Sequence, residues 1–129
     1  MRFAVLSIAL ALAACTSSPP PETPQPRQLP VELAGRVAGT PQACVTIVPT
    51  QGLRISDSDR HTLLYGSGKT LWANDLGPSC GFGANDILVM QPLNSRYCRG
   101  DVARSVDNTS RMPGPTCILG DFVPYTRGR

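Results

Sequence analysis

Three side chains that could move a proton lie close together in this sequence. Asp57 and Asp59 precede His61, which is the only histidine among the 129 residues. A carboxylate beside an imidazole often serves as an acid–base pair, and a nucleophilic serine or cysteine would have to use this ring. However, residues 56–60 have the composition of a solvated turn, and no nucleophile elbow or zinc-binding helix accompanies them. We therefore expect no catalytic residues and a protein that is not an enzyme.

The first fourteen residues have the organisation of an export signal. Arg2 supplies a positive charge, an apolar run covers residues 3–12, and small residues precede Cys15. The run is too short to span a bilayer as a mature helix. The tetrapeptide Leu12-Ala13-Ala14-Cys15 resembles the bacterial lipoprotein box. That resemblance implies cleavage before Cys15 and attachment of lipid, palmitate included, to its sulfur and its new amino group.

These features divide the chain into three segments. Residues 1–14 are the expected lipoprotein signal peptide, 15–34 the lipidated cysteine with a proline-rich tether, and 35–129 a small domain. Six prolines among residues 16–30 favour an extended, polyproline-like tether. The expected location is the periplasmic face of the cell envelope, with the membrane as a partner through Cys15. Thr16 after the anchor favours the outer membrane, by the usual bacterial sorting pattern.

The domain carries four further cysteines, Cys44, Cys80, Cys98 and Cys117. An even number of cysteines in a small exported domain is typical of disulfides. Metal sites need closer pairs or several histidines, so we expect two disulfides, no metal and no other cofactor. Cys80 and Cys98 flank one expected strand, which favours a nested pairing of Cys80 with Cys98 and of Cys44 with Cys117. The other two pairings stay open, because hairpin register could place either inner cysteine beside an outer one.

Short runs of β-branched, aliphatic and aromatic residues predict a mainly β fold. The spacing of the runs is typical of a small antiparallel sheet or a partly closed barrel with two disulfides. Turn residues such as Pro113-Gly114-Pro115 separate the runs. The clearest unit is a hairpin over 63–72, with Trp72 as its core anchor. The expected strands are residues 44–48, 62–65, 70–73, 87–91, 101–106 and 122–125.

Charge and turn chemistry exclude two classes of ligand. Loss of the signal peptide removes only Arg2 and lowers the net charge from +3 to +2, whereas nucleic-acid binding needs a dense basic face. Gly66-Ser67-Gly68-Lys69-Thr70 matches the end of a phosphate-binding loop. Leu63 stands where the first glycine of that motif belongs, and Gly77-Pro78 leaves no room for the helix that should follow. We expect no nucleic acid and no nucleotide, and a hairpin turn at Gly66, Ser67, Gly68 and Lys69.

Parts of the chain resemble two kinds of known protein. The cysteines and the hairpin resemble a bacterial family of small exported proteins that is known only as a domain of unknown function. In that family proline often follows the second of the matching cysteines, where this chain has Gly81. The residues that carry the resemblance are Cys44, 59–64, 69–72, 74–76, 80–83, Cys98 and 117–122. Separately, the turn at 66–69 is similar to the serine- and glycine-rich loop of membrane-bound lysozyme inhibitors, which implies a possible binding loop.

The expected function is therefore a lipid-anchored module of the cell envelope with a non-enzymatic binding or structural role. The partner would be another envelope protein or a cell-wall component. The alternative is an inhibitor of a cell-wall hydrolase that acts through Gly66, Ser67, Gly68 and Lys69.

The anchor can be tested by the substitution Cys15→Ser. Each buried methylene of an acyl chain contributes about 0.8 kcal/mol, so a lipoprotein with several chains should stay in the membrane almost permanently. We expect the variant to leave the membrane pellet on fractionation, while the parent protein stays there. A variant that sediments as fully as the parent would contradict the lipoprotein-box interpretation.

Overall fold

The computed structural model describes residues 27–128. The expected signal peptide, Cys15 and tether residues 16–26 lie outside the described residues. One short 3-10 helix and ten strands make up the described part of the chain. They are η1 (Val31–Leu33), β1 (Arg36–Ala38), β2 (Cys44–Thr46), β3 (Leu53–Ile55), β4 (Thr62–Tyr65), β5 (Thr70–Asp75), β6 (Asp86–Met90), β7 (Arg96–Cys98), β8 (Val102–Asp107), β9 (Pro113–Ile118) and β10 (Phe122–Arg127).

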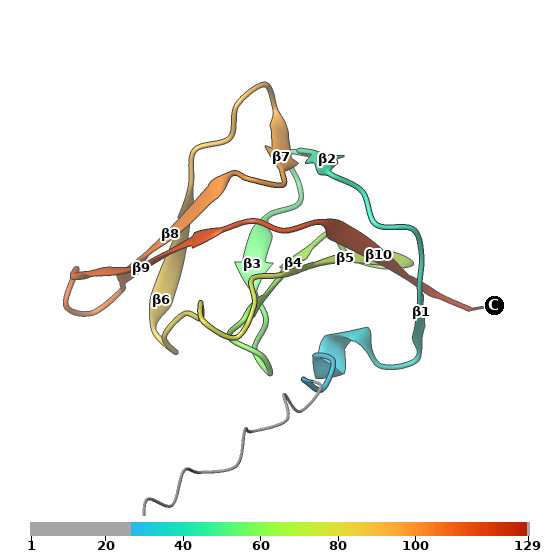
Figure 1. Ribbon diagram of the computed structural model, residues 1–129, viewed down its shortest axis with the longest axis horizontal. Helices are drawn as coiled ribbons and strands as arrows, with labels where there is room; N and C mark the ends of the chain where they lie inside the picture. The colour runs from blue at the N-terminus through green and yellow to red at the C-terminus, as the bar shows by residue number, and fades with distance from the viewer. Residues whose placement is uncertain (1–26, 129) are drawn as a thin grey trace, which may run out of the picture.

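The strands form three antiparallel sheets (Figure 1). The largest has the order β1-β10-β5-β4-β3, the second pairs β2 with β7, and the third has the order β6-β8-β9. The prediction of a mainly β fold with small antiparallel sheets is confirmed, and the sheets stay open at their outer strands. In residues 27–128 no helix is long and apolar enough to cross a membrane.

All six expected strands are present, and four others were missed. The expected strand at 62–65 coincides with β4, and β5 pairs Trp72 with Tyr65 across the expected hairpin. The missed strands β1, β3 and β7 have three residues each, too few for an alternating pattern to stand out. The missed β9 begins with the prolines that indicated a turn. Because β9 is the outer strand of its sheet, a proline there removes no hydrogen bond that the sheet needs.

Strand β4, which lies between β5 and β3, is buried on both faces. Successive side chains of a strand point to opposite sides, so Leu63 and Tyr65 join one core cluster and Leu64 joins another. The larger cluster includes Phe82, Leu119 and Phe122 and lies between the large sheet and the two smaller ones, and the half-buried Trp72 packs against it. The Tyr65 hydroxyl donates to the Thr46 carbonyl at 2.9 Å, which attaches the β2–β7 pair to β4.

The second core cluster corrects the expected boundary of the domain. Its members are Leu64, Leu71, Ala73 and Leu33, and Leu33 is 2% exposed. Residues 27–34 were expected to belong to the tether, but η1 covers the outer face of the large sheet. Burial of an aliphatic side chain contributes about 2 kcal/mol relative to its exposure. The folded domain therefore includes η1, and no more than residues 16–26 are left for the tether.

The two disulfides join the cysteines differently from the expected nested pairing. Cys44 is bonded to Cys98 and Cys80 to Cys117, so the expectation of two disulfides is confirmed and the nested pairing is wrong. Cys44 and Cys98 lie directly opposite each other in the β2–β7 pair. Cys80, in the loop after β5, reaches Cys117 on β9 and ties the large sheet to the third sheet. Strand register, which the local sequence does not reveal, determined this pairing.

Asn74 holds the corner at which β9 leads into β10. Its side chain is fully buried and makes two hydrogen bonds to Gly120. The amide nitrogen donates to the Gly120 carbonyl at 2.8 Å, and the amide oxygen accepts from the Gly120 N–H at 2.9 Å. A side chain at position 120 would bring its Cβ within 3.1 Å of the Asp75 carbonyl. Glycine at this corner therefore allows the backbones around residues 75 and 120 to approach closely.

The substitution Asn74→Ala tests the importance of this corner. It leaves both backbone groups of Gly120 without these partners in a partly buried site, which should cost about 2–4 kcal/mol of unfolding free energy. The exposed Asn108→Ala is the matched control and should stay within about 0.5 kcal/mol of the parent. Denaturant unfolding measures both variants. Equal stability of the two variants would contradict the role of Asn74.

Candidate functional site

The expected binding loop is the turn of the β4–β5 hairpin. Gly66 and Gly68 have φ values of 90° and 74°, which side chains other than glycine rarely adopt. Gly66 is buried, whereas Ser67, Gly68 and Lys69 are exposed. A strand begins directly after Lys69, as the prediction of a hairpin turn requires. The turn therefore presents one hydroxyl and one ammonium group to solvent.

Two arginines, on the outer strands β1 and β3 of the large sheet, hold this turn in place. Arg36 donates from one guanidinium nitrogen to the carbonyls of Gly68 and Lys69, both at 2.9 Å. Arg54 donates to the Gly66 carbonyl at 3.0 Å. The backbone N–H of Arg127 also donates to the Lys69 carbonyl, at 3.0 Å. A carbonyl oxygen is uncharged, so these hydrogen bonds do not neutralise the positive charge of the arginines. This end of the large sheet therefore carries four cations, Arg36, Arg54, Lys69 and Arg127.

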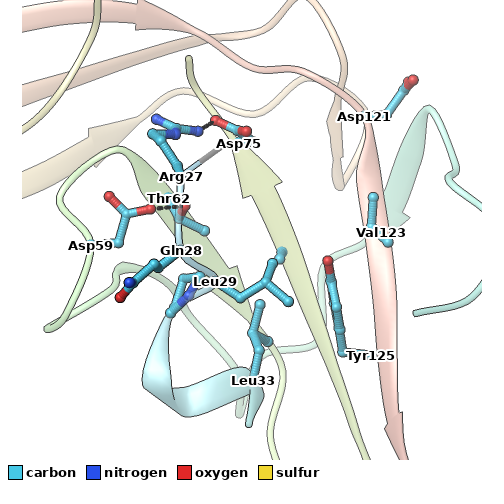
Figure 2. Close-up of a pocket in the computed structure, with 12 residues that line it drawn as sticks. Arg27, Gln28, Leu29, Leu33, Asp59, Thr62, Asp75, Asp121, Val123 and Tyr125 are labelled. Atoms are coloured by element: carbon cyan, nitrogen blue, oxygen red, sulfur yellow. Dashed lines mark hydrogen bonds and ion pairs between the residues drawn. The ribbon is translucent and has the colours of Figure 1, made fainter. Parts of the chain in front are cut away.

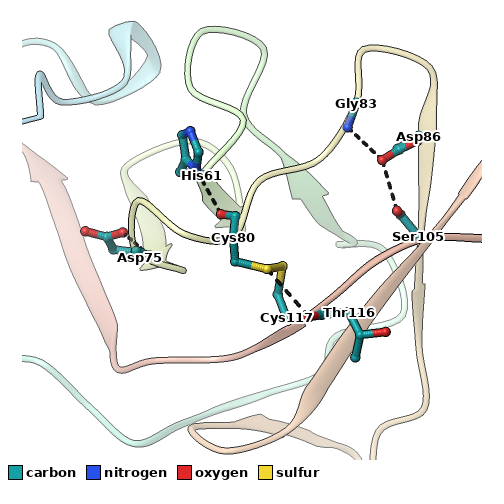
Figure 3. The surroundings of a disulfide bond; sticks show 9 residues. His61, Asp75, Cys80, Gly83, Asp86, Ser105, Thr116 and Cys117 are labelled. Atoms are coloured by element: carbon teal, nitrogen blue, oxygen red, sulfur yellow. Dashed lines mark hydrogen bonds between the residues drawn. A yellow bond between two sulfur atoms is a disulfide. The ribbon is translucent and has the colours of Figure 1, made fainter.

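Asp59 and His61, two of the three residues that could have transferred protons, form hydrogen bonds within the fold. Asp59 accepts from the His61 backbone N–H at 3.0 Å and from the Thr62 hydroxyl at 2.7 Å, so both carboxylate oxygens stabilise the turn. The His61 ring nitrogen Nδ1 lies 2.9 Å from the Cys80 carbonyl, which can only accept a hydrogen bond (Figure 3). A Cβ at position 81 would lie 2.8 Å from this ring. Gly81 thus provides the space that His61 occupies beside the disulfide.

A pocket of about 110 Å³ opens at the end of the hairpin opposite the turn (Figure 2). Asp59, Asp75 and Asp121 are among the residues that line it, and its apolar wall includes Leu33 and Val123. Arg27 enters this pocket and makes an ion pair with Asp75. Among the described residues, no three His, Cys, Asp or Glu side chains form a group suited to a metal ion.

Glu32 of η1 binds the turn that precedes β4. Its carboxylate accepts from the Ser58 hydroxyl at 2.7 Å, the Asp57 N–H at 2.8 Å and the Ser56 hydroxyl at 3.0 Å. Burial raises the pKa of the Glu32 carboxyl, but the hydrogen bonds from Ser58, the backbone and Ser56 outweigh burial and lower the pKa from 4.5 to about 2. Glu32 thereby fastens the start of the domain to the 56–62 turn.

The turn could be predicted from the sequence, but the residues that hold it could not. Arg36 and Arg54 hold the β4–β5 turn from 33 and 12 residues away, and Glu32 holds the 56–62 turn from 25 residues away. No local pattern marks an arginine that will reach a carbonyl on a neighbouring strand. The glycines of the turn were the only available signal, because their conformation is a local property.

No protein-family model, no curated protein and no solved structure matches the chain. The resemblances to the domain of unknown function and to the lysozyme inhibitors therefore stay predictions.

The Glu32 network predicts a pH dependence of stability. A carboxyl whose folded-state pKa lies below its unfolded value stabilises the fold above that unfolded value and loses this effect as pH falls. The Glu32 contribution should thus be complete above pH 4.5 and disappear between pH 4.5 and about 2. Glu32→Gln should cost about 1.5 kcal/mol at neutral pH and weaken the acid dependence in this window.

The control for this prediction is Asp57→Asn, which alters an exposed carboxylate in the same turn. Unfolding free energies measured from pH 2 to 7 compare the two variants with the parent. An unchanged acid dependence in Glu32→Gln would show that another group causes it.

Proposed function

We propose that this chain is a lipid-anchored module of the bacterial cell envelope that binds a partner through its β4–β5 turn. In this proposal Cys15 carries the lipid in the outer membrane, and the domain faces the periplasm. The role is binding, without turnover of a substrate. The observation that carries the proposal is the turn itself, a short exposed segment held in one conformation by Arg36 and Arg54.

A preformed turn is suited to binding because little conformational entropy remains to be lost. Ordering a side chain or loop at an interface costs about 0.5–1.5 kcal/mol for each immobilised side chain. Here the backbone carbonyls of Gly66, Gly68 and Lys69 are already bonded. Ser67 and Lys69 remain exposed for a partner, and the surrounding cations favour an acidic one.

The second candidate function, inhibition of a cell-wall hydrolase, follows from the same charge. Glycosidases that cleave polysaccharides use a pair of carboxyl groups on either side of the scissile bond. A fixed turn that presents the ammonium group of Lys69 is complementary to such a pair. This candidate names one specific acidic partner and is included within the more general binding proposal.

Lys69→Ala and the charge-matched control Arg104→Ala test the proposal. Arg104 is exposed on β8, in a different sheet from the turn. Full-length lipidated protein would be used to capture partners from solubilised envelopes. We expect a specific partner whose capture falls at least about tenfold with Lys69→Ala, as for a residue at the centre of an interface, and is unchanged with Arg104→Ala.

Purified lysozymes acting on suspended peptidoglycan separate the two candidates. Inhibition that depends on Lys69 supports the hydrolase inhibitor, and no inhibition by the parent protein removes that candidate. Capture that is equal for both variants would overturn binding through the turn. Hydrolytic turnover by the protein that His61→Ala or Asp59→Ala abolishes would overturn the non-enzymatic role altogether.

A further inference from the structure

Three arginines of the large sheet lie on its outer face, near the β4–β5 turn. Residues that pair directly across two strands point to the same face of a sheet. Arg54 pairs with Leu64, which belongs to the second core cluster. Arg36 pairs with Arg127, and Arg127 follows Tyr125, which packs against the same cluster, by two residues. The three arginines are therefore on the side of the sheet that η1 covers.

The positive charge of Lys69 lies between these arginines. The Arg127 N–H donates to the Lys69 carbonyl at 3.0 Å, so the pairing of β10 with β5 continues up to the turn. Arg36 and Arg54 stand on the two outer strands of the sheet, and both reach inward to carbonyls of the turn. Four positive charges thus approach one small region of surface, from both edges of the sheet and from the turn itself.

No carboxylate makes an ion pair with any of these four cations within residues 27–128. Both ion pairs of that part of the chain involve other arginines, Arg27 and Arg99. Arg36 and Arg127 are also direct cross-strand partners, and like charges in this position destabilise a sheet. An anion bound between them would remove the repulsion, so the arrangement points to a negatively charged ligand.

The free donors of this surface suit a phosphate group better than a carboxylate. Arg36 and Arg54 each use only the nitrogen Nη1 to hold the turn, so their other N–H groups remain for a ligand. A phosphate group offers three acceptor oxygens and up to two negative charges, and a guanidinium fits two of those oxygens at once. A carboxylate has only two oxygens in one plane, which suits donors on one side.

We propose that the partner recognised at the β4–β5 turn presents phosphate groups, an inference that rests on the proposed binding role of the turn and adds the chemical class of the ligand. Lys69, Arg127 and the free N–H groups of Arg36 and Arg54 bind the phosphate together. A nucleotide-binding loop is not needed, because strand β5 rather than a helix follows the turn. The phosphate belongs to a lipid headgroup or to a soluble phosphate compound.

Pyrophosphate and tricarballylate are the probes, because at mildly alkaline pH they carry a similar negative charge on phosphates and on carboxylates. Full-length protein in a non-ionic detergent is titrated with each by calorimetry. We expect pyrophosphate to bind about tenfold more tightly than tricarballylate or better, and rising salt to weaken its binding. Amide NMR shifts should be largest at residues 67–69 and 127.

Arg127→Gln and Arg96→Gln form a matched pair of variants. The Arg127 side chain makes neither ion pair of residues 27–128, and Arg127→Gln keeps the backbone N–H that bonds to Lys69. Arg96 is exposed on β7, in the second sheet. Pyrophosphate affinity should fall about fivefold in Arg127→Gln, as for one solvated charge pair. It should be unchanged in Arg96→Gln and be restored by Arg127→Lys.

Two kinds of mixed micelle distinguish the sources of phosphate. One contains phosphatidylglycerol, which is anionic, and the other phosphatidylcholine, which has no net charge. Shifts of amides 67–69 and 127 that need phosphatidylglycerol and disappear in Arg127→Gln would assign the site to a lipid headgroup. A response to pyrophosphate but to neither micelle would assign it to a soluble phosphate compound.

Three outcomes would overturn phosphate recognition. They are the absence of pyrophosphate binding, equal affinity for tricarballylate, and equal pyrophosphate affinity of the parent and Arg127→Gln. Each of them leaves capture of a partner through Lys69 intact, so the proposed function would stand with a ligand of another class. Capture that does not depend on Lys69, together with pyrophosphate binding that depends on Arg127, would instead overturn the proposed function and keep the phosphate site.

Discussion

The paired hydrogen bonds between Asn74 and Gly120 are the contact on which the arrangement of the two larger sheets depends. β9 belongs to the third sheet and β10 to the large one, and only the short segment around Gly120 separates them. The Asn74 amide makes the same pair of hydrogen bonds to Gly120 that a residue of a paired strand would make, with one donor and one acceptor. Directly after it, Phe122 pairs with Asn74 and is completely buried. The Cys80–Cys117 disulfide then ties the same two sheets together a few residues before the corner.

Because β4 is buried on both faces, the segment that precedes β1 must belong to the folded domain. A strand whose side chains are all buried needs a layer on each side, and η1 supplies the second layer through Leu33. Glu32 and Arg27 add hydrogen bonds and an ion pair to the same face. Residues 27–34, which were expected in the tether, are therefore part of the folded domain, and Arg27 lies at the hairpin end away from Lys69.

The hairpin separates charges between its two ends. Cations surround the turn at Gly66 to Lys69, while Asp59 and Asp75 lie at the other end with Arg27. The net charge of +3 is therefore distributed unevenly, with a positive region at one end of the hairpin and carboxylates at the other.

The sequence by itself determined the local features of this protein. Short runs of β-branched, aliphatic and aromatic residues located six strands, the glycines located the hairpin turn, and the number of cysteines indicated two disulfides. Tertiary structure alone decided which cysteines pair, because Cys44 meets Cys98 only after β2 finds β7 across more than fifty residues. It likewise decided that Leu33 belongs to the core, that Arg36 and Arg54 hold the turn, and that prolines are tolerated in β9. All of these features depend on the order of the strands and on their register. The hydrogen bonds that set the order and the register join residues that are far apart in the chain and share no local sequence pattern.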